Sequence, residues 1–275
     1  MKAAVLGSPI AHSLSPALHR AAYQARGLDD WTYEAIECDE ARLPGFVEER
    51  DEKWAGLSLT MPLKRTVLPL LDHTDPLAAA VGGANTLVFA EGKRHGYNTD
   101  VAGMLAALAE AGVKDFSDPL ILGAGATACS ALAALRQAGR TAAVVAVRDP
   151  SRATPLLAAA RRIGVDVTLR AFADLPMVRA GHLLISTLPA AAADFYAERV
   201  VVPANTPAVL FDVVYAPWPT VLAEAAAKAG AVVVRGFEFL LHQAVGQFEL
   251  MTGQPAPLEA MRDAGLAELE RRAVA

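Results

Sequence analysis

The stretch that decides the fold is Leu122–Ala128, LGAGATA, which follows a short apolar run and opens an alanine-rich, helix-forming run. From Gly123 to Ala128 it matches G-x-G-x-x-A, and a position between a strand and a helix gives this pattern its meaning. Gly123 would allow a tight turn, Gly125 would let the backbone approach a pyrophosphate, and Ala128 would keep the helix close to the sheet. The helix N-terminus adds N–H donors and a positive dipole end. The stretch predicts a dinucleotide-binding turn, with an ordinary strand-to-helix turn as the alternative.

The residues around this turn alternate regularly between strand and helix. Apolar runs predict strands at 120–122, 141–147, 165–170, 183–187, 209–213 and 232–234, and helices are expected at 126–138 and 151–163. Because these strands are apolar throughout, they are expected to be buried on both faces, as in a parallel sheet covered by helices. Residues 104–237 are therefore predicted to form a Rossmann-type, doubly wound parallel-sheet domain.

In the N-terminal part of the chain, predicted strands and helices alternate less regularly. Short apolar runs at 3–6, 32–36, 56–59 and 86–89 mix with helical runs at 16–26 and 40–49, which predicts an α/β domain. Two further helices are expected at 238–252 and 257–272, and no predicted strand follows them. We expect these helices to pack on the N-terminal domain, so that residues 1–103 are completed by residues 238–275.

The composition of the 275-residue chain is that of a folded protein with a sizeable core, since 53% of its residues are hydrophobic and 20% are charged. A net charge of −5 argues against nucleic-acid or anionic-membrane binding. Cys38 and Cys129 provide neither a disulfide framework nor a metal-ligand spacing, which favours a reducing cytoplasm. No charge-free apolar run reaches the roughly 18 residues of a membrane span. The sequence predicts a soluble, cytoplasmic protein without a metal, and leaves monomer or homodimer open.

Cofactor selectivity is expected to be decided at Val147–Arg152, VRDPSR, where the second strand of the domain ends. Arg148 and Arg152 could clasp a 2′-phosphate, because a guanidinium offers a planar fork to phosphate oxygens. Asp149 could instead accept hydrogen bonds from a free ribose hydroxyl. A third interpretation is that Asp149 only starts a helix and the arginines are solvated. NADP is the favoured cofactor.

A serine motif opens the N-terminal domain, in the stretch Gly7–Pro16, GSPIAHSLSP. Ser13 and Ser15 lie just ahead of Pro16 at a predicted helix start, so hydroxyl and backbone donors could converge on one anionic group. A substrate carboxylate would fit there without an arginine. The alternative is that Ser15 is only a helix N-cap.

Polar side chains also recur on the later turns of this domain. Lys64 ends the run Ser58–Lys64, SLTMPLK, and amide, hydroxyl and carboxylate groups follow at Asn85–Thr86 and Asn98–Asp100. Such groups suit a hydroxylated substrate held beside a proton-transfer pair. The alternatives are a solvated surface lysine at position 64 and a helix N-cap at Asp100. The combination favours an enzyme.

These segments resemble the shikimate dehydrogenase family, in the same order along the chain. The similarity is carried by Gly7–Pro16, Thr60–Lys64, Gly83–Thr86, Asn98–Asp100, Asp212–Thr220 (DVVYAPWPT) and Gly236–Ala244 (GFEFLLHQA). It runs nearly end to end, and several of the motifs are specific to the family. The resemblance implies the reversible, NADP-linked reduction of 3-dehydroshikimate to shikimate, in chorismate and aromatic amino-acid biosynthesis.

The resemblance also implies roles for individual residues, and Lys64 with Asp100 would form the catalytic pair. The substrate would be held by Ser13, Ser15, Thr60, Asn85, Tyr215 and Gln243. The cofactor would be bound by Gly123, Ala124, Gly125, Ala126, Arg148, Arg152, Thr187, Gly236 and Phe239. Two positions depart from the family pattern: Ala126 replaces a usual third glycine, and Val147–Asp149 replaces a usual Asn-Arg-Thr.

The expected chemistry follows from the movement of charge. Hydride delivery to a ketone builds negative charge on oxygen, so Lys64 can lower the barrier by donating a proton there, while Asp100 orients the ammonium. Two other functions remain as alternatives. An NAD-dependent quinate or shikimate dehydrogenase is kept open by Asp149, and a non-catalytic dinucleotide-sensing module would explain the fold without the lysine and aspartate pair.

Overall fold

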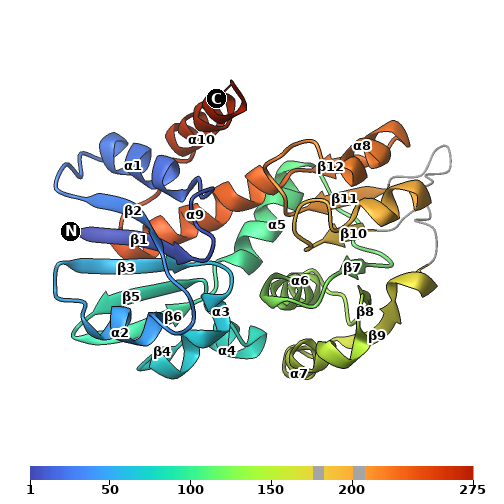
Figure 1. Ribbon diagram of the computed structural model, residues 1–275, viewed down its shortest axis with the longest axis horizontal. Coiled ribbons are helices and arrows are strands. Elements are labelled where there is room, and N and C mark those ends of the chain that lie inside the picture. The colour runs from blue at the N-terminus through green and yellow to red at the C-terminus, as the bar shows by residue number, and fades with distance from the viewer. Residues whose placement is uncertain (176–182, 201–207, 275) are drawn as a thin grey trace. The chain divides into compact units, whose positions relative to one another are not determined.

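The computed structural model describes residues 1–175, 183–200 and 208–274. The chain divides into two compact units, and Figure 1 shows their elements. Unit 1 comprises Met1–Gly103 and Leu241–Ala275, and unit 2 comprises Met104–Leu240. The divisions fall within helix α5 (Asp100–Glu110) and helix α9 (Gly236–Thr252), so each of these helices contributes to both units.

Unit 1 is built on a mixed sheet whose six described strands have the order β2-β1-β3-β5-β6-β4. The strands are β1 Lys2–Gly7, β2 Thr32–Glu37, β3 Trp54–Leu59, β4 His73–Thr74, β5 Thr86–Ala90 and β6 Lys93–Tyr97. Strands β1, β2 and β3 are parallel, whereas β5 is antiparallel to both β3 and β6. The carboxyl ends of β1, β3 and β6 therefore meet the amino end of β5 at one edge of the sheet.

Helices cover both faces of this sheet. They are α1 Ser15–Ala25, α2 Leu43–Glu48, α3 Leu63–Thr66, α4 Pro76–Val81 and α10 Leu258–Val274, with a 3₁₀ turn at Leu68–Leu70. Apolar side chains of α2, α3 and α4 pack with Leu6, Leu57 and Leu87 of the strands in one core, and α1 lies on the other face beside α10 (Figure 1). The expectation of an α/β domain is confirmed.

Helix α2 and strand β6 of unit 1 differ from the sequence-based expectation, which also did not include the short elements α3, α4 and β4. Helix α2 begins at Leu43 rather than at 40, because Asp39 Oδ1 accepts a hydrogen bond from Arg42 N at 2.9 Å and forms a turn ahead of the helix. Strand β6 was not expected, since it reads KRHGY. It forms by pairing with β5 through Glu91 and Gly92, whose φ angles of 54° and 69° suit a tight hairpin turn.

Unit 2 contains a second sheet, in which six described strands are all parallel with the order β12-β11-β10-β7-β8-β9. The strands are β7 Leu120–Leu122, β8 Ala142–Val147, β9 Asp166–Ala171, β10 Leu183–Ser186, β11 Val209–Asp212 and β12 Val232–Val234. Numbered from β7, this is the doubly wound 3-2-1-4-5-6 order. The predicted Rossmann-type domain is confirmed.

The helices of unit 2 are α6 Ala126–Gln137, α7 Thr154–Ile163 and α8 Val221–Lys228, with 3₁₀ turns at Pro150–Ala153, Phe172–Asp174 and Asp194–Arg199. The helix expected from 151 therefore begins later, at Thr154. Asp149 caps the preceding 3₁₀ turn, which takes up residues 150–153 before the helix starts. Gly164 ends α7 as its C-cap in the left-handed conformation, which glycine adopts without strain.

Candidate functional site

The polar residues predicted in unit 1 gather at the sheet edge where β1, β3 and β6 end and β5 begins. Ser13 lies in the loop after β1, Lys64 in α3 after β3, and Asp100 at the start of α5 after β6. Asn85 directly precedes β5. Strand order and direction therefore bring together side chains from four separate segments.

Lys64 and Asp100 form a buried ion pair. Lys64 Nζ lies 2.6 Å from Asp100 Oδ2, and their side chains are 13% and 2% exposed. Asp100 also occupies the first turn of α5, where the helix dipole stabilises a carboxylate. Its backbone N–H donates to Asn98 Oδ1 at 3.1 Å. Lys64 is therefore not a solvated surface lysine, and its ammonium is held in one direction by a fixed carboxylate.

Asn85 is the hub of the hydrogen bonds around this pair. Its Nδ2 donates to Asp100 Oδ1 at 2.8 Å, to Thr99 Oγ1 at 2.9 Å and to Gln243 Oε1 at 3.2 Å. Its Oδ1 accepts from Thr99 N at 2.8 Å and from Thr86 Oγ1 at 2.9 Å. Gln243 comes from α9, far along the chain, and Thr99 Oγ1 also donates to its backbone oxygen at 2.9 Å. The structure thus joins Lys64, Asn85, Asp100 and Gln243 in one network.

The serine loop lies at the same sheet edge, at the start of α1. Ser13 Oγ accepts a hydrogen bond from Ser15 N at 3.2 Å, and the Ser15 side chain is buried. Ser15 is the first residue of α1, and Leu14 occupies the N-cap position without a side-chain capping bond. The alternative in which Ser15 is only the N-cap is therefore wrong. The loop offers two hydroxyl groups beside the N-terminus of an 11-residue helix.

Two charged residues that the sequence did not single out hold this loop in place. Glu37, at the end of β2, accepts from Ser8 Oγ at 2.5 Å and from Ile10 N at 3.0 Å. Arg272, in α10, donates to His12 O at 2.8 Å and to Ser13 O at 3.2 Å. No local signal could reveal them, because they lie 29 and 260 residues from their partners.

Thr60 follows β3 and is fixed against the strand beside it. Its backbone N–H donates to Leu6 O at 2.9 Å, and its side chain is half-buried. A Cβ atom placed on Gly7 would overlap Thr60 Cγ2. The absence of a side chain at Gly7 therefore allows the loops after β1 and β3 to approach each other closely.

The glycine turn of unit 2 has the geometry of an anion site. Gly123 has a φ of 106°, and an added Cβ would lie 2.6 Å from Thr187 Oγ1. Gly125 is the N-cap of α6 without a side-chain capping bond, and no heavy atom lies within 4 Å of an added Cβ. Open space thus lies beside the N–H groups of a 12-residue helix. N–H groups at the start of a helix bind anions in many proteins.

Thr187 places the turn within the sheet. Its Oγ1 donates to Leu122 O at 2.8 Å, which ties the end of β10 to the end of β7. The strand order switches between these two neighbours: β8 and β9 follow on the far side of β7, and β11 and β12 follow on the far side of β10. In open α/β sheets, ligands bind outside the carboxyl ends of the strands at this switch point.

The Asp149 carboxylate accepts two hydrogen bonds from nearby Ser151, one from its backbone and one from its side chain. Asp149 Oδ1 accepts from Ser151 Oγ at 2.7 Å and from Ser151 N at 3.0 Å. These hydrogen bonds, with the nearby charges of Arg152 and Arg148, lower the pKa of the Asp149 carboxyl below its usual value. Both arginine side chains are exposed. Asp149 therefore caps the 3₁₀ turn at Pro150–Ala153, and the Arg148 and Arg152 guanidinium groups lie close enough to its carboxylate to lower its pKa.

The remaining predicted residues lie beyond the carboxyl ends of β11 and β12. Tyr215 follows β11 and is half-buried. Gly236 begins α9 and packs so closely that an added Cβ would overlap the backbone of Val213. Phe239 packs edge to face on Phe211, with 5.7 Å between the ring centroids. These residues share the sheet edge with the glycine turn.

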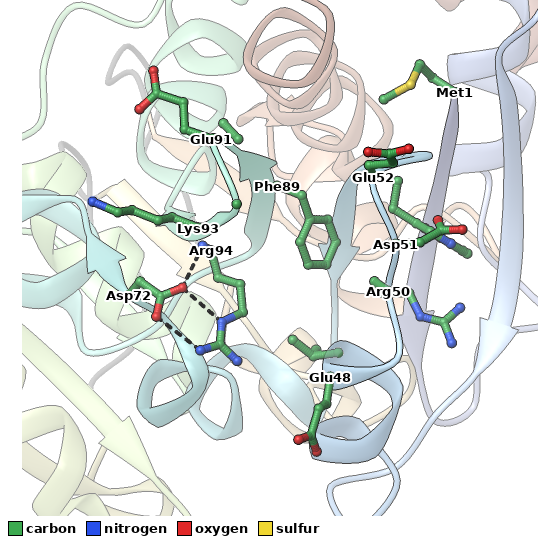
Figure 2. Close-up of a pocket in the computed structure, with 14 residues that line it drawn as sticks. Met1, Glu48, Arg50, Asp51, Glu52, Asp72, Phe89, Glu91, Lys93 and Arg94 are labelled. Atoms are coloured by element: carbon green, nitrogen blue, oxygen red, sulfur yellow. Dashed lines mark hydrogen bonds and ion pairs between the residues drawn. The ribbon is translucent and has the colours of Figure 1, made fainter.

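A separate hollow of about 540 Å³ in unit 1 is lined by residues that include Trp54 at the start of β3 and Phe89 at the end of β5. Figure 2 shows Phe89 among these lining residues. The hollow therefore lies at the opposite end of these strands from Lys64. Arg94 Nε pairs with Asp72 Oδ2 at 3.0 Å, and these hydrogen bonds hold the pKa of the Asp72 carboxyl well below its usual range. The described lining residues include no predicted site residue.

Among the described residues, no group of three or more His, Cys, Asp or Glu side chains is placed to hold a metal ion. In the same part of the chain, every helix is too short or too polar to cross a membrane.

Comparison with known protein families gives matches at both ends of the chain. Residues 5–87 match the shikimate dehydrogenase substrate binding domain. Residues 236–264 match the shikimate 5′-dehydrogenase C-terminal domain. The two matched segments contain the serine loop, Lys64, Asn85 and Gln243.

Individual relatives match along nearly the whole chain. A shikimate dehydrogenase (NADP(+)) of Thermus thermophilus is 38% identical over 283 residues, which cover 100% of this chain and 99% of the relative. The crystal structure of Mycobacterium tuberculosis shikimate dehydrogenase is similar with 43% identity and a TM-score of 0.84, covering 97% and 99% of the two chains. The crystal structure of the Thermus thermophilus enzyme in complex with NADP(H) and shikimate has 32% identity and a TM-score of 0.83, with the same coverage.

Proposed function

Because the chain belongs to the shikimate dehydrogenase family, we propose that it catalyses the NADP-linked, reversible reduction of 3-dehydroshikimate to shikimate. One observation carries this proposal. Lys64 Nζ lies 2.6 Å from Asp100 Oδ2, inside a network that also contains Asn85 and Gln243. A proton donor is thus fixed among groups that can hold ring hydroxyls. The product would enter chorismate and aromatic amino-acid biosynthesis.

The residues of unit 2 fit NADP, which supplies the hydride when it is bound. In the proposal, the N–H groups at Gly123–Ala126 receive the pyrophosphate, and Thr187 ties this turn to β10. Arg148 and Arg152 receive the 2′-phosphate. Asp149 supports this assignment, because its carboxylate already caps the 3₁₀ turn and is less available as a ribose acceptor. Gly236 and Phe239 line the nicotinamide side.

The residues of unit 1 hold the substrate in this proposal. The Ser13 and Ser15 hydroxyls and the N-terminus of α1 receive its carboxylate, a position that suits an anion. Thr60, Asn85 and Gln243 hold the ring hydroxyls, and the Asp100 carboxylate accepts a hydrogen bond from one of these hydroxyls. The family resemblance assigns Tyr215 to the substrate carboxylate.

Lys64 performs the proton transfer. When the ketone is reduced, negative charge develops on its oxygen, and the Lys64 ammonium donates a proton to it. Asp100 orients the ammonium and compensates its charge inside a buried environment, where an unpaired charge would be costly. In the reverse direction, Lys64 accepts the proton from the substrate hydroxyl as the hydride leaves the carbon.

Steady-state oxidation of shikimate and of quinate, each with NADP⁺ and with NAD⁺, tests the proposal through the absorbance of the reduced nicotinamide. Turnover of shikimate with a clear preference for NADP⁺ is expected. An NAD⁺ preference, or comparable turnover of quinate, would instead assign the chain to quinate oxidation. Folded protein that binds dinucleotide but turns over neither substrate would support a sensing module.

A further inference from the structure

Behind Asn85, the core of unit 1 contains a chain of buried polar side chains that the proposed chemistry does not use. It consists of Tyr33 from β2, Ser58 from β3, Thr86 from β5 and Gln247 from α9. Their exposed fractions are 0%, 2%, 0% and 1%. Gln247 lies one helical turn after Gln243, so both amides point from α9 toward the strands.

In this series of buried side chains, each donor points toward the next residue on the way to Asn85. Tyr33 OH donates to Ser58 Oγ at 2.6 Å, and Ser58 Oγ donates to Gln247 Oε1 at 2.8 Å. Gln247 Nε2 in turn donates to Thr86 Oγ1 at 3.2 Å and to Asn85 O at 2.9 Å. Thr86 Oγ1 then donates to Asn85 Oδ1 at 2.9 Å. The chain therefore ends on both the backbone and the side chain of Asn85.

Together with the backbone N–H of Thr99, this direction fixes which way the Asn85 amide faces. A hydroxyl has one proton to donate, and the Thr86 hydroxyl directs it at Asn85 Oδ1 while Gln247 Nε2 donates to the Thr86 oxygen. Asn85 Oδ1 is thus an acceptor, with Thr99 N as its second donor. Asn85 Nδ2 must then face Asp100 Oδ1, where a rotated amide would place an oxygen against a carboxylate.

This series of buried polar side chains also destabilises the folded protein unless each of its hydrogen bonds is formed. A buried amide or hydroxyl without its partner destabilises the folded protein, whereas an apolar side chain of the same size could fill the position without that penalty. Gln247 makes three hydrogen bonds to Ser58, Thr86 and Asn85 at a site that is 1% exposed. Its polarity therefore supplies geometry rather than simple packing.

We propose that Gln247 is a positioning residue, which acts through Thr86 and Asn85 to fix Asp100 beside Lys64. This inference rests on the proposed function, because it concerns the orientation of the same proton-transfer pair. Gln247 itself touches neither Lys64 nor Asp100 by any hydrogen bond within the described part of the chain. Its effect on turnover must therefore pass through Asn85.

Two variants break the link from Gln247 through Thr86 to Asn85 Oδ1, and Gln247→Met also removes the direct bond to Asn85 O, while a third variant serves as the matched control. Gln247→Met keeps the size of the side chain and removes its hydrogen bonds, and Thr86→Val replaces the hydroxyl link with an isosteric methyl group. Tyr33→Phe also removes a fully buried hydroxyl, which bonds to Ser58 and contacts Ser15, but it leaves the three bonds of Gln247 intact, so any effect through Ser15 should appear in the KM for shikimate and not in kcat. Thermal unfolding compares the stability cost of the three changes.

The kcat for shikimate oxidation is expected to fall about 10- to 100-fold in Gln247→Met and in Thr86→Val, the range produced when a reacting group is displaced by about 1 Å. The KM for shikimate should rise with it, because Asn85 is placed in the substrate site, while the KM for NADP⁺ stays within about twofold. Tyr33→Phe should retain kcat within about twofold. The double variant should be no slower than the slower single variant, because both changes break one chain.

A Gln247→Met enzyme with a lowered Tm but a kcat within about twofold of the wild type would overturn the inference and leave Gln247 as a packing residue. The same conclusion follows if Tyr33→Phe loses as much kcat as the other two variants. If Gln247→Met does not fold, Thr86→Val decides the question alone. A wild-type protein without shikimate turnover would overturn the proposed function and this inference together, whereas an active wild type with unaffected variants overturns only the inference.

Discussion

The binding groups proposed for unit 1 and for unit 2 are built in different ways. Unit 2 uses the backbone of one turn, Gly123–Ala126, with open space beside Gly125. Unit 1 uses side chains from separate segments, and Asn85 Nδ2 alone reaches Thr99, Asp100 and Gln243. A backbone site depends on the absence of side-chain volume, whereas a side-chain network depends on each polar atom being present. The two units should therefore fail under different kinds of substitution.

The largest expected effect concerns the ion pair of unit 1. Lys64→Ala should lower kcat for shikimate oxidation by about 10²–10⁴-fold, because a positioned proton donor and acceptor is lost. Steady-state kinetics with the exposed Lys53→Ala as the control measures this effect. A large rise in KM with an unchanged kcat would instead make Lys64 a binding residue.

The buried polar core of unit 1 should also make this unit sensitive to acid. Burial lowers the pKa of His19 to about 3 from 6.5, and its ring stacks on Tyr33 with 4.1 Å between the centroids. Below pH 6.5 the His19 side chain is protonated in the unfolded protein but stays neutral in the folded protein. The free energy of unfolding therefore decreases as the pH falls from 6.5 toward the folded-state pKa of about 3. Between about pH 7 and pH 4 this costs about 3 kcal/mol.

His19→Phe should remove that part of the pH dependence while keeping an aromatic ring against Tyr33. Denaturant unfolding at a series of pH values gives the free energy of unfolding, with the exposed His73→Gln as the control. The curve of His19→Phe should be flatter than that of the wild type over the acid range. Parallel curves for the two proteins would show that His19 is protonated in the folded state.

The smallest expected effect concerns the glycine turn of unit 2. Gly125→Val should raise the KM for NADP⁺ by roughly 10- to 100-fold, or about 1.4–2.7 kcal/mol, because the side chain would occupy the space beside the N-terminus of α6. No heavy atom lies within 4 Å of an added Cβ at Gly125 or at the control position Gly45, so clashes should not lower Tm through either change. An unchanged KM for NADP⁺ would place the pyrophosphate elsewhere.

The fold was most predictable where local sequence decides the backbone. The buried runs at β7, β10 and β11 were expected as strands of a parallel sheet, because apolar residues on both faces leave few other arrangements. Strand β6 was missed, since KRHGY has no apolar run and becomes a strand only by pairing with β5. The start of α7 was misplaced because Asp149 caps a 3₁₀ turn that precedes it.

The candidate site was predictable to the extent that its residues lie in recognisable segments. Lys64, Asn85, Asp100 and Gln243 were named from such segments, and the structure brings them into one network, while their catalytic and binding roles stay predictions. Glu37, Arg272 and Gln247 were not named. Each is a common polar residue whose surroundings in the sequence give no sign of the partner that it reaches.

By itself, the sequence determined the local features of this protein: the turn at Gly123, the buried parallel strands of unit 2 and the order of motifs that identifies the family. These depend on conformational preferences and hydrophobic burial, which neighbouring residues set. Only the tertiary structure decided that Gln247 supports Asn85 from 162 residues away and that Arg272 holds the serine loop. A hydrogen bond between distant side chains depends on strand order, register and helix packing, because its donor and acceptor must meet within about 3 Å.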